Sequence, residues 1–152
     1  MKKSLKTLAA VVCAALTLSL VGCNKDPEDL IIGTWNATTA YATTTIAGVG
    51  EEYDGTSNDT VTFAEGQYSY TFNKDNTMVL HSVDEESGEV SDDTYTYTLT
   101  DKKLVLSQDG RSQEMTITEI SKKDLVLTSS ISMAQGGASM TMDTEIHFKK
   151  AK

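Results

Sequence analysis

The sequence predicts an all-β fold, an antiparallel up-and-down β-barrel of about eight to ten strands, over residues 31–152. Three observations predict it: apolar and polar residues alternate, the strand-forming residues Thr, Tyr, Val and Ile are enriched, and short groups of turn-forming residues recur at even intervals. Because successive segments are joined by short turns, a meander is favoured over a Greek key. Closing such a meander into a barrel would remove its exposed edges.

The first 22 residues have the pattern of a secretory signal peptide. Three lysines precede residues 8–21, a run that carries no charge and is almost entirely apolar. The run is shorter than the about 20 apolar residues that a membrane-spanning helix needs. We therefore expect residues 1–22 to be removed rather than retained as a membrane span.

The motif Leu20-Val21-Gly22-Cys23 resembles the lipobox of bacterial lipoproteins. The resemblance implies cleavage before Cys23, acylation of its thiol, and residues 23–30 as a polar tether. Acidic residues directly after the cysteine resemble the export signals of Bacteroidota lipoproteins. We expect a lipid-anchored protein of the cell envelope, at the outer membrane and facing either the periplasm or the cell surface, with the membrane as partner through Cys23. An ordinary signal peptide that happens to contain a cysteine is the alternative.

Cysteine count and charge restrict the remaining possibilities. Cys13 lies in the expected signal, so no intramolecular disulfide is available and stability must come from a hydrophobic core. The formal net charge is −9 and becomes more negative when the signal is lost. This charge repels phosphate backbones and anionic head groups, so we expect no nucleic-acid partner and an anchor made of acyl chains.

The first strand is predicted at residues 33–42, where the alternating pattern begins. Residues 43–58 are rich in Thr and Gly, contain three acidic residues and lack clean alternation, which predicts a long loop. Such a loop is either a lid or binding loop, or simply a solvated connection. The next strand is predicted at residues 59–64.

The middle of the chain repeats the pattern of strand and turn. Tyr68, Tyr70 and Phe72 alternate with polar residues, and the turn that follows ends at Asn76, a residue type that can adopt the left-handed backbone conformation. Further strands and turns follow at short intervals. The predicted strands in this part are residues 67–72, 77–82, 93–100, 104–106 and 113–120.

The last two strands are predicted to form a hairpin, residues 125–133 and 140–148, joined by a glycine-containing turn. In the second strand Met140, Met142, Ile146 and Phe148 share one face with a threonine, and polar residues occupy the other. We expect the first face to be core and the second to be solvated.

Gly33-Thr34-Trp35 resembles the Gly-x-Trp signature of the lipocalin superfamily. Most of residues 31–149 resembles bacterial (Bacteroidota-type) lipocalin-like lipoproteins, and this implies a lipocalin-like barrel that can hold a small ligand. The chain differs from that pattern in two places. Asn76 replaces the usual turn glycine, and Lys149 or Lys150 would substitute for the late arginine that packs over the tryptophan. We expect Trp35 to plug a barrel end structurally, with a partner for its ring nitrogen, rather than to stack on a ligand.

The residue types that carry catalysis are sparse and scattered. His81 and His147 lie on separate predicted strands without metal-binding spacing, and the acidic residues 84–93 do not match a calcium-loop pattern. The chain has neither a nucleophile elbow nor a phosphate-binding loop motif. We therefore expect no enzyme, no metal and no cofactor.

The leading hypothesis is a non-catalytic protein that binds a small apolar or amphipathic ligand. Methionine adapts to irregular apolar ligands, although it fills gaps in cores equally well. The candidate lining residues are Tyr70, Phe72, Met78, Tyr97, Met133, Met140 and Met142. The alternative is an accessory or interaction protein of an envelope complex, with a filled barrel.

Overall fold

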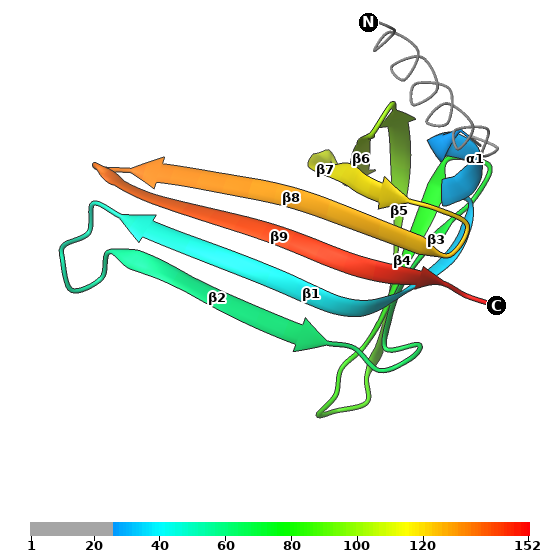
Figure 1. Cartoon of the computed structure of the whole chain (residues 1–152), viewed down its shortest axis with the longest axis horizontal. Coiled ribbons are helices and arrows are strands. Elements are labelled where there is room, and N and C mark those ends of the chain that lie inside the picture. Colours follow the sequence, from blue (N-terminus) through cyan, green and yellow to red (C-terminus); the bar gives the residue numbers. More distant parts are fainter. Residues whose placement is uncertain (1–25) are drawn as a thin grey trace, which may run out of the picture.

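The computed structural model describes residues 26–152, so the expected signal peptide and Cys23 lie outside the described residues. One short helix, α1, precedes a series of strands (Figure 1). The elements are α1 (Pro27–Ile31), β1 (Gly33–Ala47), β2 (Gly55–Thr62), β3 (Tyr68–Phe72), β4 (Thr77–Val83), β5 (Val90–Thr100), β6 (Lys103–Gln108), β7 (Arg111–Ile120), β8 (Asp124–Gln135) and β9 (Ala138–Lys150). Residues 27–30 of the expected tether are thus part of α1.

The nine strands form one antiparallel sheet in the order β2-β1-β3-β4-β5-β6-β7-β8-β9. Pairing between β1 and β9 closes the sheet, so β1 and β3–β9 make an eight-stranded barrel and β2 is one extra strand. Consecutive strands from β3 to β9 are neighbours, as in a meander. The predicted all-β, up-and-down barrel is confirmed.

The barrel is closed at one end only. β1 pairs with β3 over Gly33 to Asn36, then has a register shift between Ala37 and Thr39, and from Thr39 onward pairs with β2 instead. A bulge of this kind bends a strand and increases its twist. Figure 1 shows the result: β8, β9, β1 and β2 continue well beyond β3–β7 as a projecting sheet.

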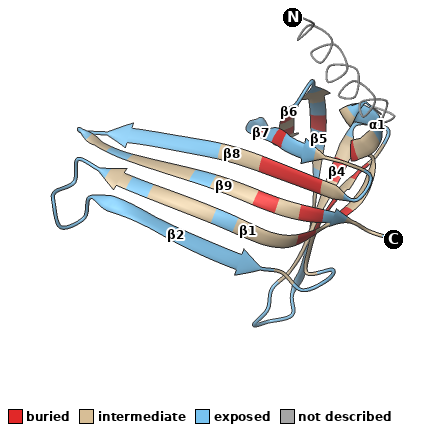
Figure 2. Ribbon diagram, in the orientation of Figure 1, coloured by how far each residue is buried: buried red, intermediate tan, exposed pale blue. Residues whose placement is uncertain are grey.

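The hydrophobic core occupies the closed end, where β3–β7 lie across the barrel from β8, β9 and the start of β1 (Figure 2). Every residue of β2 is exposed, and the last six residues of β8 are exposed as well. The largest fully buried side chains are Trp35, Phe72, Phe148, Ile31, Met78, Leu104, Ile117, Leu125 and Leu127.

The C-terminal hairpin was predicted to bury one whole face, and this holds only in part. Ile146 and Phe148 are buried opposite Leu127 and Leu125. Farther along the same face, Met140 is half-buried and its neighbour Met133 is 57% exposed. The reason is length: β8 and β9 have 12 and 13 residues, whereas β3 and β4 have 5 and 7, too few to cover the far end.

The predicted long loop over residues 43–58 is wrong. β1 runs on to Ala47 and β2 starts at Gly55, and the two pair through Thr43 and Asn58. The polar residues of β1 form a strand here because β9 pairs with β1 from Trp35 to Ala47. Tertiary pairing of this kind overrides weak local preference. Only residues 48–54 remain a loop, and the Asp54 carboxylate accepts hydrogen bonds from the backbone N–H of residues 48–50.

The turn between β3 and β4 has the expected left-handed residue. Asn76 has φ 63°, and the preceding Asp75 accepts hydrogen bonds from both the backbone N–H and the hydroxyl of Thr77. These bonds lower the pKa of Asp75. The side chain of Asp75 therefore holds the turn while Asn76 reverses the chain.

The closed end of the barrel is sealed by α1. Trp35 is fully buried and its Nε1 donates a hydrogen bond of 2.6 Å to the carbonyl oxygen of Ile31. The Lys150 ammonium donates to the carbonyl oxygens of Leu30 and Ile32 at 2.8 and 2.5 Å. Carbonyls at a helix end lack helical partners, and a cation there is favourable. Lys150, the last residue of β9, thus holds α1 in place over the end of the barrel.

Candidate functional site

A cavity of about 170 Å³ lies where the short strands and the projecting hairpin separate. One wall comes from β3–β7 and the other from β8 and β9. The lining residues are Tyr68, Tyr70, Met78, Leu80, Tyr95, Leu106, Gln113, Met115, Ser129, Ile131, Met142, Thr144 and Ile146. The cavity is therefore inside the barrel, at the boundary between the closed core and the open end.

Two tyrosines give this cavity a polar wall. The hydroxyl oxygens of Tyr68 and Tyr70 are 3.3 Å apart, and the Tyr70 ring lies 5.0 Å from the Phe148 ring in the core. Burial raises the pKa of Tyr68 and raises the pKa of Tyr70 well above its usual value. Both hydroxyls are thus neutral at ordinary pH, and each can donate and accept a hydrogen bond.

None of the residues that line the cavity has a formally charged side chain. A charged group that entered it would lose its hydration without gaining an opposite charge. The lining therefore suits an uncharged, mainly apolar group with one or two polar atoms that can bond to a hydroxyl or amide.

The cavity opens onto the projecting sheet. Met142 and Ile131 line the cavity and are opposite each other in the β8–β9 hairpin. The next pair on the same face is Met140 and Met133, and Met140 is also opposite Ile46 of β1. We call these five residues, Ile46, Ile131, Met133, Met140 and Met142, the apolar platform. It extends the apolar surface of the cavity into solvent.

The structure separates the predicted lining residues into three groups. Tyr70, Met78 and Met142 line the cavity. Phe72 and Tyr97 pack in the closed core, with ring centroids 5.2 Å apart, and the Tyr97 hydroxyl donates to the carbonyl oxygen of Asn73. Met133 and Met140 lie outside the cavity, on the apolar platform.

Several residues that line the cavity were not among the predicted lining residues, among them Tyr68, Tyr95 and Met115. A usable signal was present, because Tyr68 and Tyr95 are two positions from Tyr70 and Tyr97 and therefore share their faces. Gln113 is two positions from Met115 and shares its face in the same way, and it is opposite Leu106 in the β6–β7 pairing.

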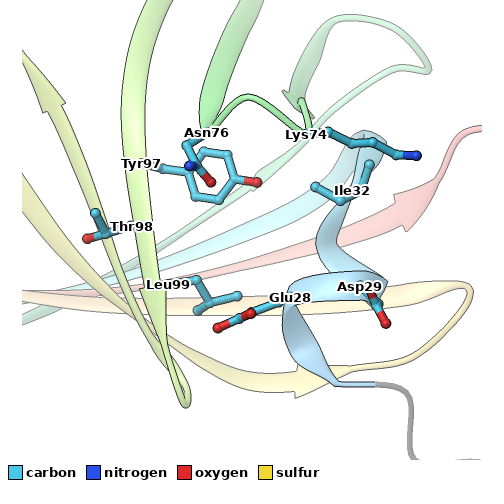
Figure 3. A pocket seen from close by; sticks show the side chains of 8 residues that line it. All are labelled: Glu28, Asp29, Ile32, Lys74, Asn76, Tyr97, Thr98 and Leu99. Carbon is cyan, nitrogen blue, oxygen red and sulfur yellow. The ribbon is translucent and has the colours of Figure 1, made fainter.

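A larger groove of about 580 Å³ lies between α1 and β5 (Figure 3). Glu28, Asp29 and Ile32 border one side, and Tyr97 and Leu99 of β5 border the other. Burial and then the nearby carboxylates of Asp75 and Glu28 raise the pKa of Tyr97. The groove is a surface depression whose charged lining residues are Glu28, Asp29 and Lys74. We regard the uncharged cavity as the better candidate for a ligand site.

The two histidines form isolated pairs. His81 Nδ1 is 2.7 Å from a carboxylate oxygen of Asp92, and His147 Nε2 is 2.6 Å from one of Glu145. Within residues 26–152, no group of three or more His, Cys, Asp and Glu side chains is placed to hold a metal ion. In the same part of the chain, no helix is long and apolar enough to cross a membrane.

Comparison with known proteins agrees with this geometry. Residues 31–127 match the model of a family described as "Lipocalin-like domain". No curated protein matches the sequence. Among solved structures, apocrustacyanin C1 is similar, with 13% sequence identity, a TM-score of 0.50 and coverage of 82% of this chain and 63% of that chain. Apocrustacyanin C2 has the same identity and coverage and a TM-score of 0.49. This chain thus spans less than two thirds of those proteins, and the likeness concerns the fold.

Proposed function

The chain belongs to the lipocalin-like domain family, and on that premise we propose that it binds a small apolar or amphipathic molecule at the open end of its barrel, without catalysis. The observation that carries this proposal is the uncharged cavity between β3–β7 and the β8–β9 hairpin. Eight-stranded barrels of this type commonly hold one small ligand.

The size of the cavity limits what it holds. Ligand pockets commonly have about 300–1,000 Å³, whereas this cavity has about 170 Å³. We therefore propose that an apolar part of the ligand, such as an alkyl chain end or a small ring, enters the cavity. The rest of the ligand lies on the apolar platform, where methionine side chains adapt to its shape.

The experiment compares alkyl alcohols and fatty acids of increasing chain length, by native mass spectrometry and by displacement of an environment-sensitive apolar dye from the purified protein. Met142→Glu places a charge at the mouth and should weaken binding about tenfold or more, because the carboxylate must be desolvated or the ligand excluded. Thr141→Glu is the matched control, since Thr141 is adjacent in β9 and faces the opposite side.

The two variants separate the possible results. Binding that is weakened in Met142→Glu but not in Thr141→Glu supports the cavity as the ligand site. Equal binding by both variants and the unchanged protein would place the ligand elsewhere. Failure of every probe to bind, with the fold intact by circular dichroism, would contradict the proposal.

We also propose that the protein is anchored in the cell envelope by acyl chains on Cys23, at the outer membrane. Support comes from the lysines, the apolar run and the Leu20-Val21-Gly22-Cys23 motif of the sequence. Labelled palmitate supplied to cells should be incorporated into the unchanged chain and not into Cys23→Ser. Label in both, or in neither, would contradict the anchor.

A second function, that of an accessory protein in an envelope complex, is favoured by one specific observation. The apolar platform stays open to solvent, with Ile131 44% and Met133 57% exposed. Exposed apolar surface of this kind often marks an interaction site. A protein that binds no probe ligand but binds an envelope protein, and loses that protein in Met133→Glu, would have this function instead.

A further inference from the structure

The outer edge of β8 is open along half of its length. β7 pairs with β8 only as far as Thr116 opposite Thr128, and beyond that point residues 129–135 pair with β9 alone. Six consecutive residues, from Ser130 to Gln135, are exposed. An exposed strand edge of this kind can pair with a strand of another chain.

The register indicates which backbone groups face outward. Gln135 and Ala138 flank a two-residue turn formed by Gly136 and Gly137, both with positive φ. In such a hairpin the flanking residues form a hydrogen-bonded pair, and such pairs alternate along the ladder. Ser130, Ser132 and Ala134 are therefore the residues that direct their N–H and C=O groups away from β9.

This edge carries no charge, in contrast to other open strand segments within residues 26–152. β2 has Asp59, which is opposite Ala42 and so lies on the same sheet face as the apolar platform. The open part of β5 has Asp92 and Asp93, and that of β7 has Arg111 and Glu114. Charged residues on edges discourage pairing. Residues 129–135 lack this protection, which matters in a chain of net charge −9 whose copies otherwise repel each other.

The sequence of the edge is self-complementary about Ser132. If two copies pair antiparallel with Ser132 opposite itself, Ile131 is opposite Met133 of the second copy, and small Ser130 is opposite Ala134. Apolar residues then meet on one sheet face and small residues, Ser and Ala, on the other. An interface about a two-fold axis requires this kind of symmetry, since the same patch is used twice.

We propose that two copies of this chain associate through residues 129–135 of β8, paired antiparallel about Ser132 to join the two projecting sheets into one. The outward backbone groups of both edges then become hydrogen-bonded, and Ile131 and Met133 become less exposed. The pairing groups are backbone groups of the edge, so the association does not require a ligand. Ile131 nevertheless also lines the cavity and, with Met133, belongs to the apolar platform.

The first test is disulfide cross-linking in the full chain. Directly opposed residues of a hydrogen-bonded antiparallel pair lie about 5.5 Å apart at Cα, within reach of a disulfide. Ser132→Cys should therefore give a covalent dimer of twice the chain mass about tenfold faster than the unchanged chain, whose sequence contains only Cys13 and Cys23 as cysteines.

Two control variants test whether the strands pair in the proposed register and whether the pairing edge is that of β8. Ser130→Cys lies on the same edge but is opposite Ala134, so two such cysteines are too far apart to bridge. Thr60→Cys lies on the exposed β2 edge. Cross-linking of either control at the rate of Ser132→Cys would overturn the proposal, and so would a cross-link from Ser132→Cys to a chain of different mass.

The second test needs no cysteine. Ser132→Lys places two like charges opposite each other and should raise the dimer dissociation constant about tenfold or more, whereas Thr60→Lys should leave it unchanged. Native mass spectrometry over a concentration series measures both. A monomer at every concentration in the unchanged chain, or equal dimer in both variants, would overturn the proposal.

Discussion

The ammonium group of Lys150 lies 4.4 Å from the centroid of the Trp35 ring, opposite it in the β1–β9 pairing. A cation over an indole face is attracted by the ring, and the same ammonium bonds to the carbonyls at the end of α1. The adjacent Lys149 instead pairs with Asp124 on the surface. Of the two lysines that the sequence suggested for the missing arginine, Lys150 therefore packs over the tryptophan.

Lys150→Met should lower the free energy of unfolding by about 2 kcal/mol, because it keeps the length of the side chain but removes its charge-assisted bonds and leaves two partly buried carbonyl groups without that donor. Urea unfolding followed by Trp35 fluorescence measures the change. Lys149→Met is the control and should change stability little, since its ion pair is exposed. Equal effects of both substitutions would contradict a special role for Lys150.

Asn76→Val should lower the free energy of unfolding by about 1–2 kcal/mol, because a branched side chain is strained at φ 63°. Asn76→Gly should be neutral or stabilising at the same position. Thermal unfolding compares both with Lys74→Val, an exposed change in the same turn. A Val variant as stable as the Gly variant would show that the turn tolerates another backbone conformation.

Alkaline titration should show late ionisation of tyrosine at the cavity. Burial raises the pKa of Tyr70 well above 10.0, so above about pH 10 the unfolded chain ionises this hydroxyl while the folded chain keeps it protonated. Stability is thus maintained below that pH and falls as the pH rises further. Tyrosinate absorbance of the folded protein should have a late component. Tyr70→Phe should reduce this component without abolishing it, because burial also raises the pKa of Tyr68 and Tyr97, whereas Tyr53→Phe, at a 68% exposed tyrosine, should retain it. A titration unchanged by Tyr70→Phe would contradict burial of this hydroxyl.

Gly48→Ala should separate the two loops at the tip of the projecting sheet. A Cβ at Gly48 would lie 2.2 Å from the carbonyl oxygen of Gly137, so one loop must move. Amide hydrogen exchange should then increase in both loops. Gly50→Ala is the control, because Gly50 also has positive φ but no atom lies near its added Cβ. Faster exchange at residues 136–137 in both variants would indicate backbone strain alone as the cause.

Local pattern was sufficient for most of the strands and for the faces of their residues. Side chains alternate between the two faces of a strand, so the spacing of Tyr68, Tyr70 and Phe72 shows which residues point the same way, whatever lies opposite. The same holds for the turn at Asn76, whose conformation depends on neighbours within a few residues. The sequence by itself therefore determined an all-β meander and the sets of residues that share a face.

Only the tertiary structure decided how far each face is covered and which residues meet. Met142 lines a cavity while Met133, on the same face, is exposed, because coverage depends on the lengths of distant strands. Residues 43–47 are a strand because β9 pairs with them, although their own pattern predicts a loop. Lys150 rather than Lys149 contacts Trp35 because of the β1–β9 register. Register and coverage arise from contacts between residues far apart in the chain, and no local pattern contains them.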